Sequence, residues 1–168
     1  SKSLSPVLRL GYIVAPHALI KELRLIRHAM VRHPSAFLQH AYALFLSLGH
    51  HDSHARRVNA AVRERLELAA KALREHLPTF VFTLPQGGAS IWVRAPAWVD
   101  AEELALLARG HGVLIEAGTV FFAMPPYPCP FFRLRLSSIA TTQIAEGVRA
   151  LALAFDELAQ GRSARLSG

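Results

Sequence analysis

Lys2 and Arg9 are the first residues of this chain whose types and spacing could do chemistry. They stand seven residues apart in the segment S-K-S-L-S-P-V-L-R-L-G-Y. A lysine amine on a mobile stem can form an imine with an aldehyde when its pKa is lowered. An arginine supplies the opposing charge and hydrogen-bond donors that a phosphate requires. A turn at Ser5-Pro6 would let the segment fold back so that both side chains serve one ligand.

Two further arginines occur in the segment F-R-L-R-L-S-S at positions 132–138. The alternation predicts a strand that carries Arg133 and Arg135 on one face and apolar side chains on the other. A planar guanidinium binds a carboxylate through two parallel hydrogen bonds, which a lysine cannot reproduce. The pattern does not choose between the two arginines, and either one could also be an ordinary solvated residue.

Two other groups of residues are weaker candidates for chemistry. His50, His51, Asp52 and His54 are of the types that bind transition metals, but their spacing is loose and no remote partner is evident. We therefore expect a solvated helix start there and no metal site. Cys129 is the single cysteine, which excludes an intrachain disulfide and predicts a free, buried thiol in a reducing compartment.

The composition limits the classes of protein to which the chain can belong. It has 168 residues, 52% of them hydrophobic, a mean hydropathy of +0.25 and a net charge of +7. Such apolarity predicts either a large core or apolar surface that is covered by something outside this chain. The basic residues are spread along helices with acids nearby, and no DNA- or RNA-binding signature is present. No apolar run approaches the roughly 20 residues of a membrane span, and no signal peptide is visible, so we expect a cytoplasmic protein without membrane contact.

The segments that must position these side chains have hydrophobic patterns typical of helices and of strands. A nearly continuous apolar run predicts a buried strand over 8–14. A small sheet is expected later in the chain, and Trp92 is expected to be buried in it. The order of elements predicts a mixed α/β fold in which helices cover a small sheet. The predicted helices cover 17–33, 35–48, 52–77, 100–109 and 141–158, and the predicted strands cover 80–82, 90–93, 113–116 and 132–137.

The Lys2 segment resembles the cofactor-binding segment of fold-type I enzymes that use pyridoxal 5′-phosphate (PLP), which reads S-K-x-x-x-P-x-x-R-x-G-[YW]. The similarity extends over nearly the whole chain, although Ala117 stands where that family usually has proline. The other similar segments are H-A-R-R at 54–57, G-G-A-S-I-W at 87–92, G-V-L-I-E-A-G-T-V-F-F at 112–122 and F-R-L-R-L-S-S at 132–138.

This resemblance implies a role for each candidate residue. Lys2 would be the catalytic, Schiff-base lysine, Arg9 would hold the PLP phosphate, and Arg133 would bind the α-carboxylate of a substrate or effector. Residues 1–48 would be the C-terminal remnant of the large, PLP-binding domain and 49–160 the small domain. Residues 161–168 are expected to form a flexible tail.

Within that superfamily the motifs are most similar to the aminotransferase-like domain of MocR-type regulators of the GntR class. The resemblance implies a fragment of a homodimeric transcriptional regulator that uses PLP to sense an amino acid or amine. DNA binding would belong to an upstream domain outside this chain. PLP would be held by the intact protein, and we expect the fragment alone to bind none.

Two alternatives to the regulator remain open. The chain could be the same part of a catalytic class I/II aminotransferase, which transfers amino groups between amino acids and 2-oxo acids. It could also be a domain kept only for dimerisation or as a scaffold, with its ligand site lost. PLP absorbance of the intact protein would separate the first two functions from the third.

Overall fold

The chain divides into two units, and the division lies between Asn59 and Ala60 inside a long helix. The computed structural model describes residues 8–166. The first unit contains α1 (His17–Val31), α2 (Ala36–Ser47) and the start of α3 (His50–His76). Within residues 8–166, no helix is both long enough and apolar enough to span a bilayer.

Local sequence signals separate the first two helices as predicted. Pro34 lies between α1 and α2, where its missing N–H and fixed φ disfavour a continuous helix. The Ser35 hydroxyl then accepts a hydrogen bond from the Leu38 N–H at 3.4 Å and caps α2. Gly49, with φ of +72°, ends the turn between α2 and α3 in the left-handed region that glycine adopts readily.

The predicted strand over 8–14 is wrong. Residues 9–16 form no regular element, and the side chains of Tyr12 and Val14 are 89% and 88% exposed. A strand that is buried on both faces needs neighbouring strands for its backbone hydrogen bonds. All strands within residues 8–166 lie in the second unit, so this apolar segment has no ladder to join.

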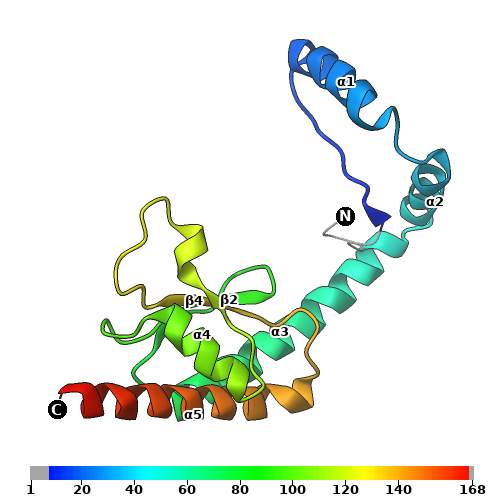
Figure 1. Ribbon diagram of the computed structural model, residues 1–168. Coiled ribbons are helices and arrows are strands. Elements are labelled where there is room, and N and C mark those ends of the chain that lie inside the picture. The colour runs from blue at the N-terminus through cyan, green and yellow to red at the C-terminus, as the bar shows by residue number, and fades with distance from the viewer. Residues whose placement is uncertain (1–7, 167–168) are drawn as a thin grey trace. The chain divides into compact units, whose positions relative to one another are not determined.

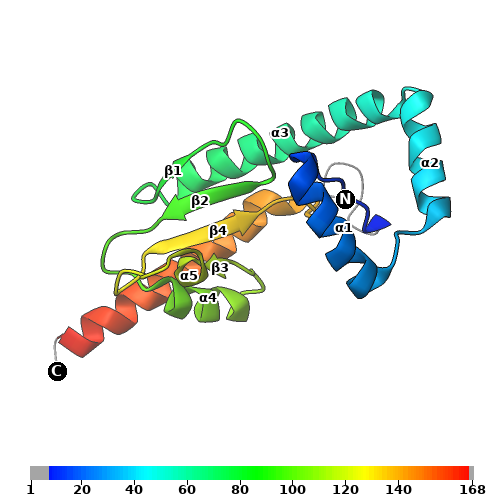
Figure 2. The same ribbon diagram turned by 90° about the horizontal axis from the view of Figure 1, so that it is seen from above.

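The second unit is a four-stranded sheet with helices on one face, which confirms the predicted mixed α/β class. The strands follow the order β1-β2-β4-β3, and all neighbours are antiparallel. Figures 1 and 2 show α5 running along the sheet, with α4 beside it. The elements are β1 (Val81–Thr83), β2 (Ser90–Arg94), α4 (Ala101–Gly110), β3 (Glu116–Ala117), the short 3₁₀ helix η2 (Gly118–Phe121), β4 (Phe131–Arg135) and α5 (Thr141–Leu166).

Alternation along β2 and β4 decides which side chains enter the core. Ile91 and Val93 of β2 and Phe132 and Leu134 of β4 are buried, and they belong to one cluster with apolar residues of α3, α4 and α5. Their neighbours in sequence point to the other face, as the period of two requires. Arg133 and Arg135 therefore share the face opposite the helices, as predicted.

Asp100 connects the start of α4 to the loop before β4. Its Oδ1 accepts hydrogen bonds from the N–H groups of Glu102 and Glu103 at 2.8 and 3.4 Å, which confirms the predicted cap. Its Oδ2 accepts from the Cys129 N–H at 3.3 Å. The Cys129 side chain is buried and is not part of a disulfide, as expected from its solitary position in the sequence.

Several boundaries and one burial prediction differ from expectation. Helix α3 begins at His50 because Gly49 ends the preceding turn, and Ser53 donates its hydroxyl to the His50 carbonyl instead of capping the helix. β3 contains only two residues, Glu116 and Ala117. Trp92, expected in the core, is 37% exposed because it lies on the sheet face opposite the helices.

The prediction that the last helix ends near Leu158 is also wrong. Helix α5 continues through Gly161 to Leu166, so most of the segment that was expected to be an irregular tail is helical. A single glycine costs only about 1 kcal/mol relative to alanine inside a helix, which does not suffice to end one. Residues 167 and 168 lie outside the described residues.

Gly118 allows β3 and β4 to approach closely. A Cβ atom at this position would lie within 2.4 Å of the Phe131 carbonyl oxygen and 2.8 Å of its carbonyl carbon. Backbone atoms of a paired strand cannot move aside as the end of a flexible side chain can. Glycine is therefore required where η2 leaves β3 and passes beside β4.

Replacing Gly118 by alanine is expected to lower the free energy of unfolding by about 1–3 kcal/mol, because the added methyl overpacks the β3–β4 contact. Chemical denaturation followed by circular dichroism measures the change. Gly147→Ala is the matched control, since Gly147 sits inside α5 and a Cβ added there would meet no atom within 4 Å beyond its chain neighbours and the nearby backbone of its own helix. That control should be neutral or slightly stabilising. Equal stability of Gly118→Ala and the parent would contradict the requirement for glycine.

Candidate functional site

The candidate residues fall in three parts of the chain. Lys2 lies outside the described residues, Arg9 belongs to the first unit, and Arg133 belongs to the second. The geometry of Arg9 and the geometry of Arg133 are therefore described separately.

Arg9 offers a positive charge on exposed backbone ahead of α1. Its φ of +47° places it in the left-handed region, which is uncommon for a residue other than glycine. The residue is exposed, and no carboxylate within residues 8–166 forms an ion pair with it. Its role toward a phosphate stays a prediction from the motif.

Arg133 forms both an ion pair and a cation–π contact in the second unit. On the neighbouring strand, Glu116 is its direct cross-strand partner. Arg133 Nε donates to Glu116 Oε2 at 2.7 Å, and its Nη2 contacts the same oxygen. The guanidinium carbon also lies 4.7 Å from the centre of the Phe121 ring. Arg133 is therefore held by an ion pair along one edge and by a cation–π contact with a ring.

Aromatic side chains form a cluster beside Arg133 on the open face of the sheet. The rings of Trp92 and Phe131 stack with their centres 5.9 Å apart, and Phe121 meets Trp92 edge-on at 5.4 Å. Phe122 contacts Phe131 at 5.4 Å. Phe121 thus joins the guanidinium to a cluster of rings on this face, which makes that side of Arg133 apolar.

Both members of the ion pair line a cavity of about 740 Å³. Its wall also includes the polar side chains of Arg135, Gln143 and Glu146. Cavities of roughly 300–1,000 Å³ are typical of small-molecule sites.

The two arginines of β4 differ in their surroundings. Arg133 is paired with Glu116 and packs on Phe121, whereas Arg135 is exposed and lies across the ladder from Ser90. Within residues 8–166 no carboxylate forms an ion pair with Arg135. Orientation by neighbours makes Arg133 the better candidate for geometric recognition of a carboxylate.

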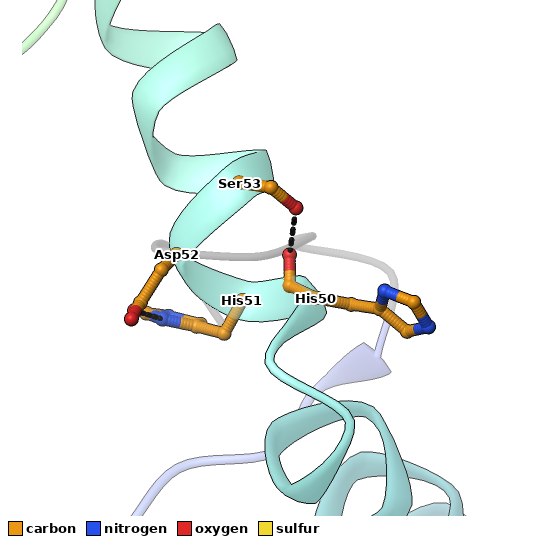
Figure 3. A network of polar contacts seen from close by, with 4 residues as sticks. All are labelled: His50, His51, Asp52 and Ser53. Carbon is orange, nitrogen blue, oxygen red and sulfur yellow. Dashed lines mark hydrogen bonds and ion pairs between the residues drawn. The ribbon is translucent and has the colours of Figure 1, made fainter.

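The histidine-rich start of α3 has side chains that diverge. Figure 3 shows His51 directed at Asp52 and His50 pointing away from both. The His51 Nδ1 lies 3.4 Å from Asp52 Oδ1, while the rings of His50 and His54 pack beside Phe45. Among residues 8–166 no three His, Cys, Asp or Glu side chains are grouped closely enough to hold a metal ion.

Sequence reasoning missed Glu116 and Phe121 as neighbours of Arg133. Glu116 is the only charged residue in the segment V-L-I-E-A-G-T-V-F-F, and an isolated charge at the end of an apolar strand was a usable signal. The register that pairs Glu116 with Arg133 depends on β3 joining the edge of β4, which local patterns do not specify.

Comparison with known proteins adds relatives of two kinds. The HTH-type transcriptional regulator TauR of Rhodobacter capsulatus is 46% identical over 155 residues, covering 92% of this chain and 32% of its own length. The probable rhizopine catabolism regulatory protein MocR of Rhizobium meliloti is 30% identical over 158 residues, covering 92% of this chain and 31% of its own length. The chain thus spans about a third of the length of these curated relatives.

A solved structure and a family model complete the comparison. The kynurenine aminotransferase of Pyrococcus horikoshii, solved in complex with PMP, matches with a TM-score of 0.85 and 25% identity, covering 94% of this chain and 39% of that one. These relatives confirm the predicted resemblance both to fold-type I aminotransferases and to transcriptional regulators. The model described as aminotransferase class I and II matches residues 1–151. The chain therefore belongs to the aminotransferase class I and II family.

Proposed function

We propose that this chain is the effector-sensing part of a PLP-dependent transcriptional regulator that responds to an amino acid or amine. The observation that carries the proposal is the 46% identity to an HTH-type transcriptional regulator over 92% of the chain. The match to a solved aminotransferase over a similar share has 25% identity. Membership of the family fits both a regulator and an aminotransferase. The higher sequence identity to the regulator favours the regulator.

In this proposal Lys2 and Arg9 hold the cofactor. PLP supplies an electron-poor aldehyde that bonds reversibly to amines. The Lys2 amine would anchor the cofactor covalently and give way to the amine of the effector. Arg9 would neutralise the phosphate, and its exposed guanidinium without an acidic partner in the described part of the chain supports that role.

Arg133 would orient the effector through its carboxylate. Glu116 contacts the Nε and Nη2 side of the guanidinium, and Phe121 packs against the group. Nη1 forms no hydrogen bond within residues 8–166, which supports its availability to a ligand. The stacked Trp92 and Phe131 rings nearby would shield the bound anion from water.

Signalling would follow from binding energy that differs between two conformations. Residues 49–160 would close upon the effector. This conformational change would be transmitted to a DNA-binding domain elsewhere in the intact, cytoplasmic protein. A homodimer is part of this proposal. The exposed apolar side chains of α1 and α2, which include Met30 and Phe37, support a further contact surface in the intact protein.

A catalytic aminotransferase is the second candidate, because the family model and the solved kynurenine aminotransferase favour it. In that case Lys2 would also move a proton on the bound substrate, and Arg133 would hold the same carboxylate. Steady transfer of amino groups from amino acids to 2-oxo acids would be the diagnostic activity. Response of DNA binding to an amino acid without such turnover would identify the regulator.

The test uses the full-length product of the gene loaded with PLP. A panel of amino acids is titrated while the visible absorbance of the lysine-bound cofactor and binding to DNA upstream of the gene are followed. We expect one class of amino acid to change both signals. Lys2→Ala should abolish the absorbance and the response, whereas Lys21→Ala, on α1, should leave both intact. A response unaffected by Lys2→Ala would overturn the proposal.

A further inference from the structure

We infer that Glu116 is an affinity-setting residue, which weakens the binding of carboxylates to Arg133 and so sets the effector concentration that fills the site. The inference rests on the proposed role of Arg133 in binding an anionic group. It assigns a function to a carboxylate that the sequence motifs leave without one.

The first support is the geometry of the pair. Glu116 and Arg133 are direct cross-strand partners, so the two side chains start from neighbouring positions on β3 and β4. A single oxygen, Glu116 Oε2, receives both the Nε and the Nη2 contacts. One carboxylate of the chain already occupies hydrogen-bonding capacity and charge that a ligand carboxylate would use.

The second support is that the pair is accessible to a ligand. The side chains of Arg133 and Glu116 are 34% and 44% exposed, and both line the 740 Å³ cavity. Ion pairs with this much solvent contact are weak. An incoming carboxylate can therefore displace Glu116, or bind beside it on the Nη1 side of the guanidinium.

Both modes of binding predict that Glu116 lowers the affinity of Arg133 for a carboxylate. Displacement requires the loss of the internal ion pair, and binding beside Glu116 places two negative charges on one guanidinium. The opposing effect would be that Glu116 positions Arg133 for the ligand. Phe121 packs against the guanidinium, with its ring centre 4.7 Å from Cζ, and β4 pairs with strands on both sides, so much of the orientation does not depend on Glu116. We therefore expect the charge effect to dominate.

The test measures a simple carboxylate on this chain in the absence of PLP. Nitrogen-15 NMR follows the Arg133 Nε–H resonance, which is assigned by its loss in Arg133→Lys. Sodium propionate is the probe at constant ionic strength, and propionamide is its uncharged counterpart. Glu116→Gln keeps an oxygen that can accept the Nε–H bond but removes the charge. Glu146→Gln is the matched control, because Glu146 lines the same cavity without contacting Arg133.

We expect Glu116→Gln to lower the propionate Kd about fivefold, which corresponds to about 1 kcal/mol. Glu116→Ala should change the Kd in the same direction, and Glu146→Gln should leave it unchanged. Propionamide should shift the resonance in none of the variants. An unchanged or higher Kd in Glu116→Gln would overturn the inference, as would an equal gain in Glu146→Gln.

The full-length protein separates this inference from the proposed function. There, Glu116→Gln should lower the amino-acid concentration for half-maximal response by a similar factor. If Arg133→Ala leaves the amino-acid affinity unchanged, the proposed role of Arg133 fails while the propionate result on Glu116 still stands. If Arg133→Ala destroys binding and Glu116→Gln does not tighten it, the role of Glu116 alone fails.

Discussion

Replacing Phe132 by alanine is expected to lower the free energy of unfolding by about 3–5 kcal/mol. Phe132 is fully buried in β4 and is paired with Val93 on one side and Ala117 on the other. Its ring meets the edge of Phe80 with centres 6.0 Å apart, within the cluster that joins the sheet to its helices. Truncation leaves a cavity between the sheet and its helices, and the ladders on both sides of β4 limit how far the strand can move to fill it.

Denaturation by urea, followed by circular dichroism, measures this loss. Leu106→Ala is the control, because Leu106 is a large apolar side chain of the same unit that is exposed on α4. That change should alter stability by no more than about 0.5 kcal/mol. A loss at Phe132 as small as that of the control would mean that β4 is not the centre of the core.

The core of the second unit could be predicted from the sequence because its signals are local. Alternation in F-R-L-R-L predicts which side chains of β4 are buried, and the structure confirms that Phe132 and Leu134 are. Asp100 likewise caps α4 as its position before Glu102 and Glu103 predicts. Each of these features depends on interactions within a few residues or on a period of two.

Features that depend on distant partners were not predictable in the same way. The apolar run at 8–14 has the composition of a buried strand, yet whether it pairs depends on strands that the run itself does not specify. Trp92 was expected in the core because it is a large aromatic side chain. It lies between Ile91 and Val93, however, and the alternation of the strand places it on the opposite face. The Glu116–Arg133 pair depends on the register of β3 against β4.

For Arg133 in the full-length protein, truncation to alanine is expected to weaken amino-acid binding by at least about thirtyfold, or about 2 kcal/mol. The reason is the loss of the two charge-assisted hydrogen bonds that the proposed function assigns to Arg133 and the carboxylate. Cofactor loading should survive, since the proposed function assigns it to Lys2 and Arg9. Arg135→Ala is the matched control: Arg135 lies two residues along the same strand face and does not contact Glu116 or Phe121.

Amino-acid titration of the parent, Arg133→Ala and Arg135→Ala, followed by cofactor absorbance, distinguishes the possible outcomes. Arg133→Lys should recover only part of the affinity, because an ammonium retains the charge but not the planar pair of donors. A large loss confined to Arg135→Ala would assign the carboxylate to the other arginine of β4. Equal affinity in Arg133→Ala and the parent would remove Arg133 from the site, and the ion pair with Glu116 would then be structural.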